Sequence, residues 1–493
     1  MSGSLTGGAA PSPLANELHN GRRMPTLAER PKPKPVLFPE YCKGCGRCID
    51  ACSYHCIEPG SEIHQGTGLV PVSIHLEKCT GCGLCFDACP EPYGLRPALF
   101  DAPVAEPPRV SPAFVATPSP EPIPDCRLAL PDSQPLVIKG MYASAIGAIL
   151  AGCRHFFGYP ITPSTEGAEL MARLLPQLDG HFLQAVSEVA AINMMYGAGA
   201  AGVRATTFTS SPGFSLMLEG ISYMIGAKLP GVIVNVMRGG PGLGNIAPEQ
   251  SDIKLACRGL GHGNTHAIVL APSTPQEMLD HTMLAFDLSF TYRNPVVVLA
   301  DGYLGQMTGK VALPRTMVKP GLPAWAVSGD EAHRRNLIVS IFMREADLEA
   351  ENLRLLDKYA RIADAEQRAD EFHCDDADVL LVACNTPARM AKGAVRTLRA
   401  MGVKAGLFRP LTLWPFPIRS LAPLLGHVRC VIVVEASAGQ LEDEMRLAIS
   451  RAGIPRTPRI ESLSRYGGVL PSHDEIVARA ISESPARAGG AAA

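Results

Sequence analysis

Nine of the fifteen cysteines in this chain of 493 residues lie between residues 42 and 89. Eight of them form two runs of the same spacing, C-x2-C-x2-C-x3-C: Cys42, Cys45, Cys48 and Cys52, then Cys79, Cys82, Cys85 and Cys89. Thiolates bind soft metal ions, and thiols can also pair as disulfides. The crowding therefore predicts either a metal cofactor or a set of disulfides.

The spacing favours two iron–sulfur clusters. In the bacterial two-cluster pattern, three cysteines of each run hold one [4Fe–4S] cluster and the fourth reaches across to the other cluster. One cluster would use Cys42, Cys45, Cys48 and Cys89, and the other Cys79, Cys82, Cys85 and Cys52. The alternatives are zinc, which usually takes two C-x2-C pairs, and disulfides, which belong to short secreted domains. Ser53 stands where the first run would have proline, and Cys56 is an extra thiol without an assigned role.

Four other blocks follow predicted strands, where ligands bind in open α/β sheets. They are GYPITPST (158–165), QAVSEVAAINMMYGAGAAG (184–202), FTSSPGFSLMLEGISYM (208–224) and MRGGPGLGNIAPEQSD (237–252). From the residues alone they predict only a crevice for a ligand. An acidic residue that opens a helix, such as Glu188, more often compensates the helix dipole than catalyses a reaction, and Thr162 could equally be a turn or cap residue.

The elements that position these residues fall into several segments. Eleven prolines between Pro97 and Pro135 predict an extended linker. Beyond it, apolar runs alternate with helical ones, which indicates doubly wound parallel sheets; the strands expected are 155–160, 204–209, 231–237, 295–301, 379–384, 404–410 and 430–437, and the helices 188–201, 216–225, 387–401 and 439–449. The predicted segments are a disordered arm (1–35), a two-cluster domain (36–97), the linker (98–135), an α/β domain (136–315), a partly helical connection (316–372), a second α/β domain (373–485) and a disordered tail (486–493).

Charge and hydropathy exclude several classes of protein. There are 45 Lys and Arg against 47 Asp and Glu, so neither a polybasic nucleic-acid surface nor a long acidic tail is expected. The first 35 residues lack the apolar core of a secretory leader, and no run of 18 apolar residues predicts a membrane span. We therefore expect a cytoplasmic protein with reduced cysteines; the six outside the cluster segment, scattered from Cys126 to Cys430, should mostly be buried.

The four blocks, in their order, resemble the alpha subunit of the 2-oxoacid:ferredoxin oxidoreductases, most closely the 2-ketoisovalerate branch. The similarity covers about residues 136–485 and continues through YRNPVVVLADGYLGQM (292–307), LFRPLTLWPFP (407–417) and VVEASAGQLEDEMRLAI (433–449). The cysteine segment resembles the small delta subunit of these complexes, so the chain resembles a delta–alpha fusion. The resemblance implies a thiamine-diphosphate domain of the pyrimidine-binding type, a second α/β domain like the transketolase C-terminal domain, and an α+β diferredoxin domain.

The resemblance also implies roles for individual residues. Glu188, in the SEVAA motif, would hydrogen-bond the pyrimidine N1′ of thiamine diphosphate and so promote removal of the thiazolium C2 proton. Thr162, in the YPITP motif, would contact the thiazolium and the substrate carboxylate. Further cofactor contacts are expected from Tyr159, Pro160, Ile161, Ser210, Ser211 and Gly213.

Half of the cofactor site is missing from the sequence. Thiamine enzymes bind the diphosphate through Mg²⁺ with a GDG followed by an asparagine, and this chain has no GDG; the nearest string, at Asp301-Gly302, lacks the downstream asparagine. A beta subunit is therefore expected to supply the Mg²⁺ and diphosphate site, usually with a gamma subunit.

The resemblance implies oxidative decarboxylation of a 2-oxoacid with coenzyme A, electrons leaving through the two clusters to ferredoxin or another low-potential acceptor. A branched-chain 2-oxoacid is the expected substrate. Two alternatives remain: the same chemistry on an aryl 2-oxoacid (phenylglyoxylate, indolepyruvate) or 2-oxoglutarate, and a subunit that only transfers electrons and supports a complex.

Overall fold

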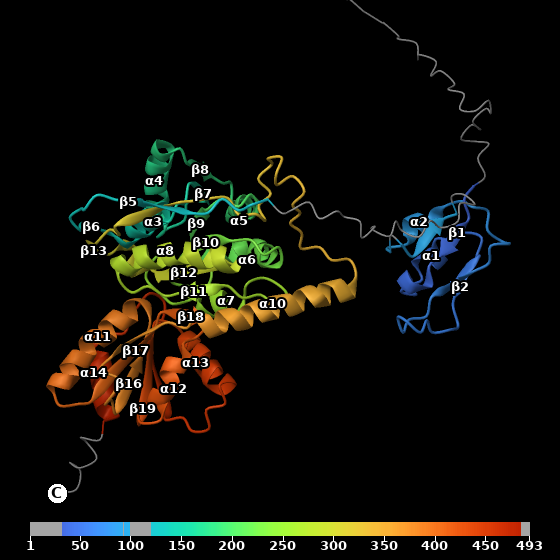
Figure 1. Cartoon of the computed structure of the whole chain (residues 1–493). Coiled ribbons are helices and arrows are strands. Elements are labelled where there is room, and N and C mark those ends of the chain that lie inside the picture. The colour runs from blue at the N-terminus through green and yellow to red at the C-terminus, as the bar shows by residue number, and fades with distance from the viewer. Residues whose placement is uncertain (1–31, 92, 99–119, 485–493) are drawn as a thin grey trace, which may run out of the picture. The chain divides into compact units, whose positions relative to one another are not determined.

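The computed structural model describes residues 32–484 except residue 92 and residues 99–119. The chain divides into two compact units, Met1–Thr117 and Pro118–Ala493, which Figure 1 draws in one view. Most of the predicted arm, the predicted tail and the middle of the predicted linker lie outside the described residues. The two units are described separately below.

The first unit contains short helices and two-stranded ribbons around its cysteines. Its elements are β1 (Pro35–Leu37), the 3-10 helix η1 (Pro39–Tyr41), α1 (Arg47–Asp50), β2 (Ile57–Pro59), β3 (Val72–Ile74), α2 (Leu84–Ala88) and β4 (Leu95–Pro97). Strand β1 pairs antiparallel with β4, and β2 pairs antiparallel with β3. Each helix starts after a glycine in the left-handed conformation, Gly46 (φ 78°) and Gly83 (φ 88°), where a side chain would be strained. The two cysteine runs therefore fold into similar loop-to-helix turns.

The second unit begins with a seven-stranded sheet in the order β18-β11-β12-β10-β9-β7-β8. Its strands are β7 (His155–Gly158), β8 (His181–Gln184), β9 (Ala205–Ser210), β10 (Gly231–Met237), β11 (Ile268–Leu270), β12 (Pro295–Asp301) and β18 (Thr412–Trp414). All neighbours are parallel except β18 and β11. Strands β9, β10 and β12 are buried throughout, as expected for a parallel sheet covered on both faces.

Helices cover both faces of this sheet, and their bounds are α3 (Gly140–Leu150), α4 (Thr165–Leu174), η2 (Leu175–Leu178), α5 (Glu188–Ala200), α6 (Ser211–Gly226), α7 (Ile253–Arg258), α8 (Pro275–Tyr292) and α9 (Gly302–Gln306). Helix α3 packs on α8, and α5 packs on α6 (Figure 1). Right-handed crossovers require this division, because the connections through α4 and α8 run in the opposite direction to those through α5 and α6.

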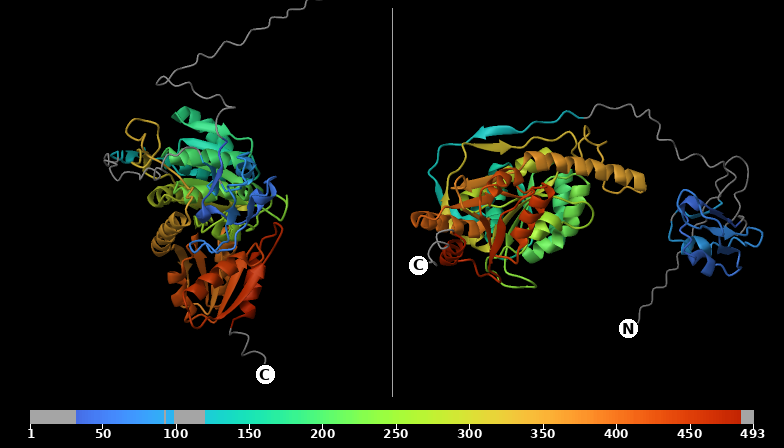
Figure 2. Two further views of the ribbon diagram at one scale, coloured as in Figure 1. Left: turned by 90° about the vertical axis from the view of Figure 1, so that its right-hand side faces the viewer. Right: turned by 90° about the horizontal axis from the view of Figure 1, so that it is seen from below.

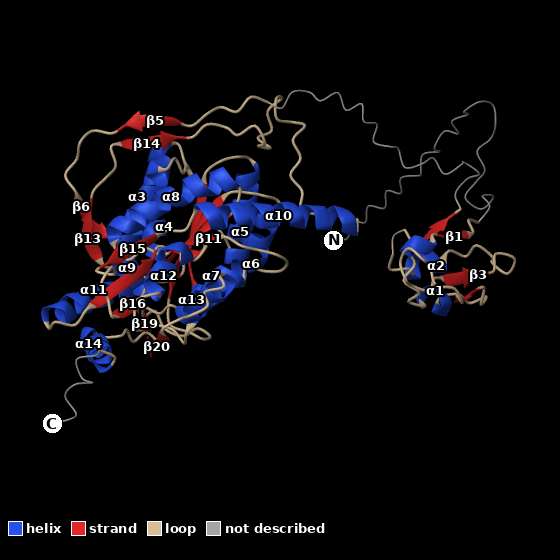
Figure 3. Cartoon of the chain, turned by 60° about the horizontal axis from the view of Figure 1, so that its bottom comes forward, coloured by secondary structure: helices blue, strands red, loops and turns tan. Residues whose placement is uncertain are grey.

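Two antiparallel ribbons extend this domain: β6 (Leu136–Lys139) pairs with β13 (Thr308–Val311), and β5 (Cys126–Ala129) pairs with β14 (Thr316–Lys319) (Figure 3). The β5 strand lies inside the predicted linker. Asp125 beside it forms an ion pair with the buried Arg204 and accepts a hydrogen bond from the Gly321 amide (2.8 Å). The last part of the predicted linker therefore belongs to the packed structure of the second unit.

A five-stranded sheet follows, in the order β15-β17-β16-β19-β20. Its strands are β15 (Ala369–Phe372), β16 (Val379–Val382), β17 (Ala405–Pro410), β19 (Cys430–Glu435) and β20 (Arg459–Ser464), with β15 antiparallel to β17. Its helices are α11 (Asn385–Ala400), α12 (Ile418–Leu425), α13 (Gln440–Arg451) and α14 (His473–Ser482). Helix α10 (Glu345–Ala365) lies between the two sheets of the unit (Figure 2, left), where the Tyr359 hydroxyl donates to the Asn264 carbonyl (3.0 Å).

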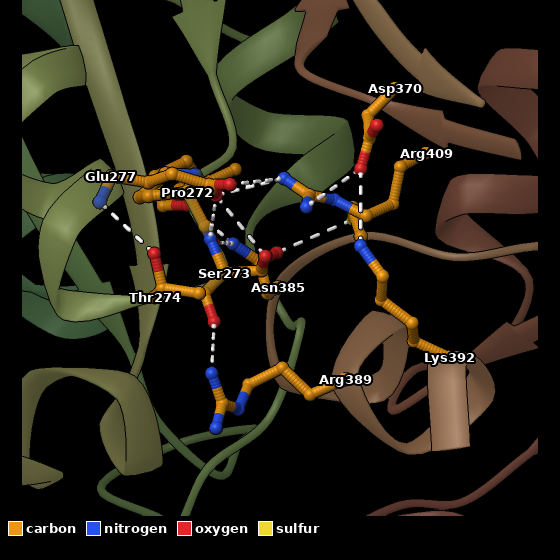
Figure 4. A network of polar contacts seen from close by, with 11 residues as sticks. Pro272, Ser273, Thr274, Glu277, Asp370, Asn385, Arg389, Lys392 and Arg409 are labelled. Carbon is orange, nitrogen blue, oxygen red and sulfur yellow. Dashed lines mark hydrogen bonds and ion pairs between the residues drawn. The ribbon is translucent and has the colours of Figure 1, made fainter. Parts of the chain in front are cut away.

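A polar network joins the two sheets (Figure 4). Arg409 of β17 is 5 % exposed and donates to both carboxylate oxygens of Glu277, at 2.9 and 2.8 Å. Asp370 accepts a further bond from the same guanidinium at 3.3 Å. Burial acts to raise the pKa of Glu277, but the Arg409 charge outweighs it, and the pKa lies below its usual value. Glu277 is therefore ionised and depends on Arg409 for its partner.

We expect Arg409→Met to lower the free energy of unfolding by about 3–5 kcal/mol, because it leaves two carboxylates partly buried without their cation. Arg419→Met is the matched control: Arg419 pairs with Asp364 at the surface, 56 % exposed, and should contribute at most about 1 kcal/mol. Urea unfolding followed by tryptophan fluorescence reports the difference, since Trp414 lies on β18 between the two sheets. Equal losses in the two variants would contradict this role for the network.

Candidate active site

The candidate site lies where the order of the first sheet reverses. The chain runs from β7 outward to β8 and then returns to β9 on the other side of β7. Ligands of open α/β sheets bind at such a switch point, beyond the carboxyl ends of the strands. The segments that leave β7, β8 and β9 there begin at Tyr159, Ala185 and Ser211. Three of the four sequence blocks thus meet at one edge.

Glu188 is the first residue of α5 and is only 4 % exposed. The hydroxyl of Ser187 caps the helix by accepting a hydrogen bond from the Ala190 amide at 3.3 Å, so the Glu188 carboxylate is not needed as the cap. No hydrogen bond joins that carboxylate to another side chain or amide in the described part of the chain. The structure therefore leaves Glu188 available to a ligand.

Gly213, in the first turn of α6, lies against this carboxylate. A β-carbon on Gly213 would come within 2.4 Å of Glu188 Oε1 and within 2.4 Å of Thr209 Oγ1, so only glycine fits. The Thr209 hydroxyl is buried and has no hydrogen-bond partner among the described residues. A carboxylate, an unpaired hydroxyl and a bare backbone thus form one cradle. Sequence analysis missed Thr209, which stands beside the predicted Ser210 in the same block.

A second group surrounds the predicted residue Thr162. Thr162 is exposed, and its carbonyl accepts a hydrogen bond from Arg238 Nη1 at 2.8 Å. The Arg238 amide donates to the Ser211 hydroxyl at 3.1 Å, and Arg238 Nε is buried without a partner in the described chain. The first turn of α6 holds both Ser211 and Gly213, and so connects this group to the Glu188 cradle. Arg238 was also missed, although it opens the fourth block.

The other predicted cofactor contacts differ in their environment. Tyr159 and Pro160 are exposed, whereas Ile161 is half-buried and its carbonyl accepts from the Ser164 hydroxyl at 2.8 Å. Ser210 is fully buried, and its hydroxyl donates to the Val236 carbonyl at 2.8 Å. That hydroxyl therefore links β9 to β10 within the sheet.

The fourth block forms a loop held by carboxylates. Glu249 accepts from the amides of Gly240 (2.7 Å) and Gly467 (3.0 Å), and so ties the loop to the second α/β domain. Asp252 accepts from the Asn235 amide group (2.9 Å), and burial raises the pKa of its carboxyl. The loop tip carries two exposed apolar side chains, Leu243 (84 % exposed) and Ile246 (61 %).

Asp301, the nearest approach to a diphosphate-binding aspartate, has a structural role. It is completely buried, caps α9 by accepting from the amides of Tyr303 (3.0 Å) and Leu304 (2.9 Å), and accepts from the amide and the hydroxyl of Thr386 (both 2.8 Å). Both carboxylate oxygens are occupied by these bonds. Asp301 is thus not available to a metal ion.

In the first unit, two cavities separate the cysteines into the predicted sets. One cavity is lined by Cys42, Cys45, Cys48 and Cys89, and the other by Cys52, Cys79, Cys82 and Cys85 together with Cys56. The fourth cysteine of each run therefore faces the first three of the other run, as two crossed clusters require. Within the described residues, no three or more His, Cys, Asp or Glu side chains converge as on a single metal ion.

Burial raises the pKa of the Cys48 and Cys85 thiols to about 11, so both are protonated at neutral pH without a metal. Iron must displace these protons when a cluster forms. The cysteines outside this unit have no such grouping: Cys153, Cys257, Cys374, Cys384 and Cys430 are buried and Cys126 is exposed, which confirms that most of them are buried. No helix in the described part of the chain is long and apolar enough to cross a bilayer.

Three family models match the chain. Residues 146–334 match the thiamine diphosphate-binding domain of pyruvate flavodoxin/ferredoxin oxidoreductases, residues 377–476 match pyruvate:ferredoxin oxidoreductase core domain II, and residues 41–92 match the 4Fe-4S dicluster domain. The first match contains Glu188, Thr209, Gly213 and Arg238, and the third contains the eight predicted cluster ligands.

Known proteins are similar over the same regions. The chain is 47 % identical over 336 residues to the ketoisovalerate oxidoreductase subunit VorB of Methanothermobacter thermautotrophicus, covering 68 % of this chain and 94 % of the relative. It is 38 % identical over 347 residues to the 2-oxoglutarate synthase subunit KorA of Archaeoglobus fulgidus, covering 68 % and 95 %. Among solved structures, 2-oxoglutarate:ferredoxin oxidoreductase from Magnetococcus marinus is similar with a TM-score of 0.65 and 26 % identity, over 71 % of this chain and 65 % of that one.

Proposed function

The chain belongs to the 2-oxoacid:ferredoxin oxidoreductases as an alpha subunit with an N-terminal 4Fe-4S dicluster domain, and we propose that it oxidatively decarboxylates a branched-chain 2-oxoacid to its acyl-coenzyme A. The reaction would take place at a thiamine diphosphate site shared with a beta subunit. The carrying observation is the cradle of Glu188, Thr209 and Gly213 inside the thiamine diphosphate-binding domain.

This cradle fits the aminopyrimidine half of the cofactor. When bound, thiamine diphosphate supplies the carbon nucleophile and the electron sink that decarboxylation of a 2-oxoacid needs. Glu188 would hold a proton at the pyrimidine N1′, because its buried carboxylate has no partner in the described chain. Gly213 allows a flat ring to approach the backbone, and the unpaired hydroxyl of Thr209 can bond to a polar edge of that ring.

Arg238 would bind the carboxylate of the substrate. Its guanidinium lies beside Thr162, and its Nε has no partner in the described chain. A guanidinium pairs with a carboxylate through two parallel hydrogen bonds, which fixes the orientation of a 2-oxoacid as well as binding it. Arg238 also holds the Thr162 carbonyl, and thereby the turn that the predicted Thr162 contact depends on.

We expect Arg238→Met to raise the KM for the 2-oxoacid by about 10- to 100-fold, since a hydrogen bond to a charged group contributes roughly 1.5–3 kcal/mol. Steady-state kinetics of the assembled complex separate this effect from kcat. Arg173→Met, which removes an exposed arginine from α4, is the matched control and should leave the KM within about twofold. An unchanged KM in Arg238→Met would show that the substrate carboxylate binds elsewhere.

The remaining half of the site would come from partner subunits. Asp301 is occupied by four hydrogen bonds, so we propose that Mg²⁺ and the diphosphate bind to a beta subunit. Near Glu188 and in the fourth block, Val186 (88 % exposed), Leu243 and Ile246 present apolar side chains that a partner surface would cover. A gamma subunit would complete the assembly, and the two clusters would pass electrons to ferredoxin or another low-potential acceptor.

The branched-chain substrate is supported by identity: the ketoisovalerate subunit is 47 % identical and the 2-oxoglutarate synthase subunits are 34–38 % identical. The latter keep 2-oxoglutarate as the second candidate. Aryl 2-oxoacids and a purely electron-transferring role have no such support, and the Glu188 cradle speaks against the latter.

Anaerobic reduction of a viologen dye by the purified complex, measured across a panel of 2-oxoacids with coenzyme A, tests the proposal. We expect 3-methyl-2-oxobutanoate to have the largest kcat/KM, at least about tenfold above 2-oxoglutarate, because a second carboxylate would have to lose its hydration in an apolar pocket. A preference for 2-oxoglutarate or phenylglyoxylate would overturn the substrate, and no turnover with any acid would favour the electron-transfer role.

A further inference from the structure

The second cluster cavity has a fifth thiol. Cys56 is 3 % exposed and lines the cavity of Cys52, Cys79, Cys82 and Cys85, although it stands outside the C-x2-C-x2-C-x3-C spacing. The corresponding position after the other run, four residues beyond Cys89, is Tyr93, which is 46 % exposed and lies against Tyr41 with ring centroids 5.8 Å apart. The two otherwise similar cavities therefore differ by one buried thiol.

Cys56 contacts a predicted cluster ligand directly. The two sulfur atoms of Cys56 and Cys52 are 3.1 Å apart, and the Cys56 amide also donates to Cys52 Sγ at 3.4 Å. Cysteine binds iron only as a thiolate, which has no proton to donate. When Cys52 holds a cluster, the bond between the sulfurs must therefore run from the Cys56 S–H to the Cys52 sulfur.

The first cavity is arranged differently. There the sulfur of Cys89 lies 3.4 Å from the carbonyl oxygen of Glu91, and a carbonyl can accept but not donate. The Glu91 carboxylate, which pairs with Lys43 at 2.6 Å, also lies on this cavity, whereas the second cavity has no acidic residue in its lining. A carboxylate near a cluster disfavours the extra negative charge of the reduced form, and a donor to a ligand sulfur favours it.

We propose that Cys56 is a positioning residue that donates an S–H hydrogen bond to the Cys52 ligand and raises the reduction potential of the second cluster above that of the first. Each cluster takes up one electron, from the 2-oxoacid oxidised in the complex or from dithionite in a titration. No bond forms or breaks in this step, and Cys56 keeps its proton. Electrons would settle on the second cluster, which makes it the exit from the domain. The inference rests on the proposed ligand sets.

The test is a redox titration of the iron-loaded full chain followed by EPR, with Cys56→Ala, Cys56→Ser and, as a control, Cys126→Ala at an exposed cysteine. At the wild-type midpoint of the second cluster, the ratio of reduced to oxidised cluster should fall three- to tenfold in Cys56→Ala, tenfold being about 59 mV. Cys56→Ser, which keeps a donor, should lose less. The first cluster and the iron content should not change, and a Cys82→Ser variant identifies the signal of the second cluster.

Equal potentials in Cys56→Ala and wild type, a shift of both clusters, or a fall as large in Cys126→Ala would overturn the proposal. Loss of a whole cluster in Cys56→Ala would make Cys56 a ligand and overturn it too. ENDOR of the reduced wild-type chain in D₂O provides a test without a variant: an exchangeable thiol proton should couple to the second cluster, and its absence contradicts the inference. A wild-type chain that cannot hold both clusters would instead refute the ligand sets.

Discussion

Glu188→Gln should abolish turnover of the complex, with a loss of about 10²- to 10⁴-fold in kcat, the range for removal of a group that handles a proton. An amide in this buried position can no longer hold the proton of the pyrimidine nitrogen as a carboxylate does. The visible absorbance and the iron content should remain, because Glu188 lies in the second unit and the clusters in the first. Turnover is measured as anaerobic dye reduction, and iron by colorimetry on the same sample.

The matched control is Glu169→Gln, which removes one carboxylate from an exposed position on α4. Its kcat should stay within about twofold of wild type, as for most surface substitutions. Bound thiamine diphosphate, measured in both variants after gel filtration, distinguishes lost chemistry from lost binding. Full activity in Glu188→Gln would show that the catalytic assignment is wrong.

Single cysteine-to-alanine variants should divide into two classes that cross the two runs. Cys45→Ala and Cys89→Ala should both lose the cluster of the first cavity, and Cys82→Ala and Cys52→Ala that of the second, each removing about half of the iron bound by the domain. The reason is geometric, since Cys89 lines the cavity of Cys45. Iron content and EPR of the reduced chain report which cluster remains.

The sequence runs themselves make the alternative explicit. If each run held its own cluster, Cys89→Ala would remove the same signal as Cys82→Ala and leave that of Cys45 intact. Cys126→Ala, at an exposed cysteine of the second unit, should leave both signals unchanged. A common loss in Cys82→Ala and Cys89→Ala would therefore contradict the crossed assignment.

The parts of the fold that could be predicted are those with strong local signals. Strands β10 and β12 begin and end at the predicted residues, because continuous Val, Ile and Leu runs are typical of strands buried on both faces. Helix α5 begins at Glu188 as expected, after the cap residue Ser187. The duplicated cysteine spacing was enough to predict the two sets that the cavities separate.

Other elements were missed because their signals are weak or distant. Strand β8 (HFLQ) is a short edge strand with mixed polarity, and α8 was not predicted at all. Helix α6 begins at Ser211 rather than at 216, since Pro212 suits the first turn of a helix. Contacts such as Arg409 with Glu277, 132 residues apart, depend on the packing of two domains and have no local pattern.

The candidate site shows the same division. The motifs located Glu188, Thr162 and Gly213, whereas the role of their neighbours depends on spatial proximity. Arg238 follows Thr162 by 76 residues, and only the fold brings its guanidinium to the Thr162 carbonyl. Ser210 and Thr209 are adjacent, but alternate residues of a strand face opposite sides, so their hydroxyls meet different surroundings.

The most direct test of the central claim is a structure of this chain with its beta subunit and thiamine diphosphate. The account predicts the aminopyrimidine at Gly213, with its N1′ about 2.6–3.2 Å from the Glu188 carboxylate, and the diphosphate with Mg²⁺ on the beta subunit. A cofactor whose pyrimidine lies away from Glu188, or one bound wholly within the beta subunit, would contradict it.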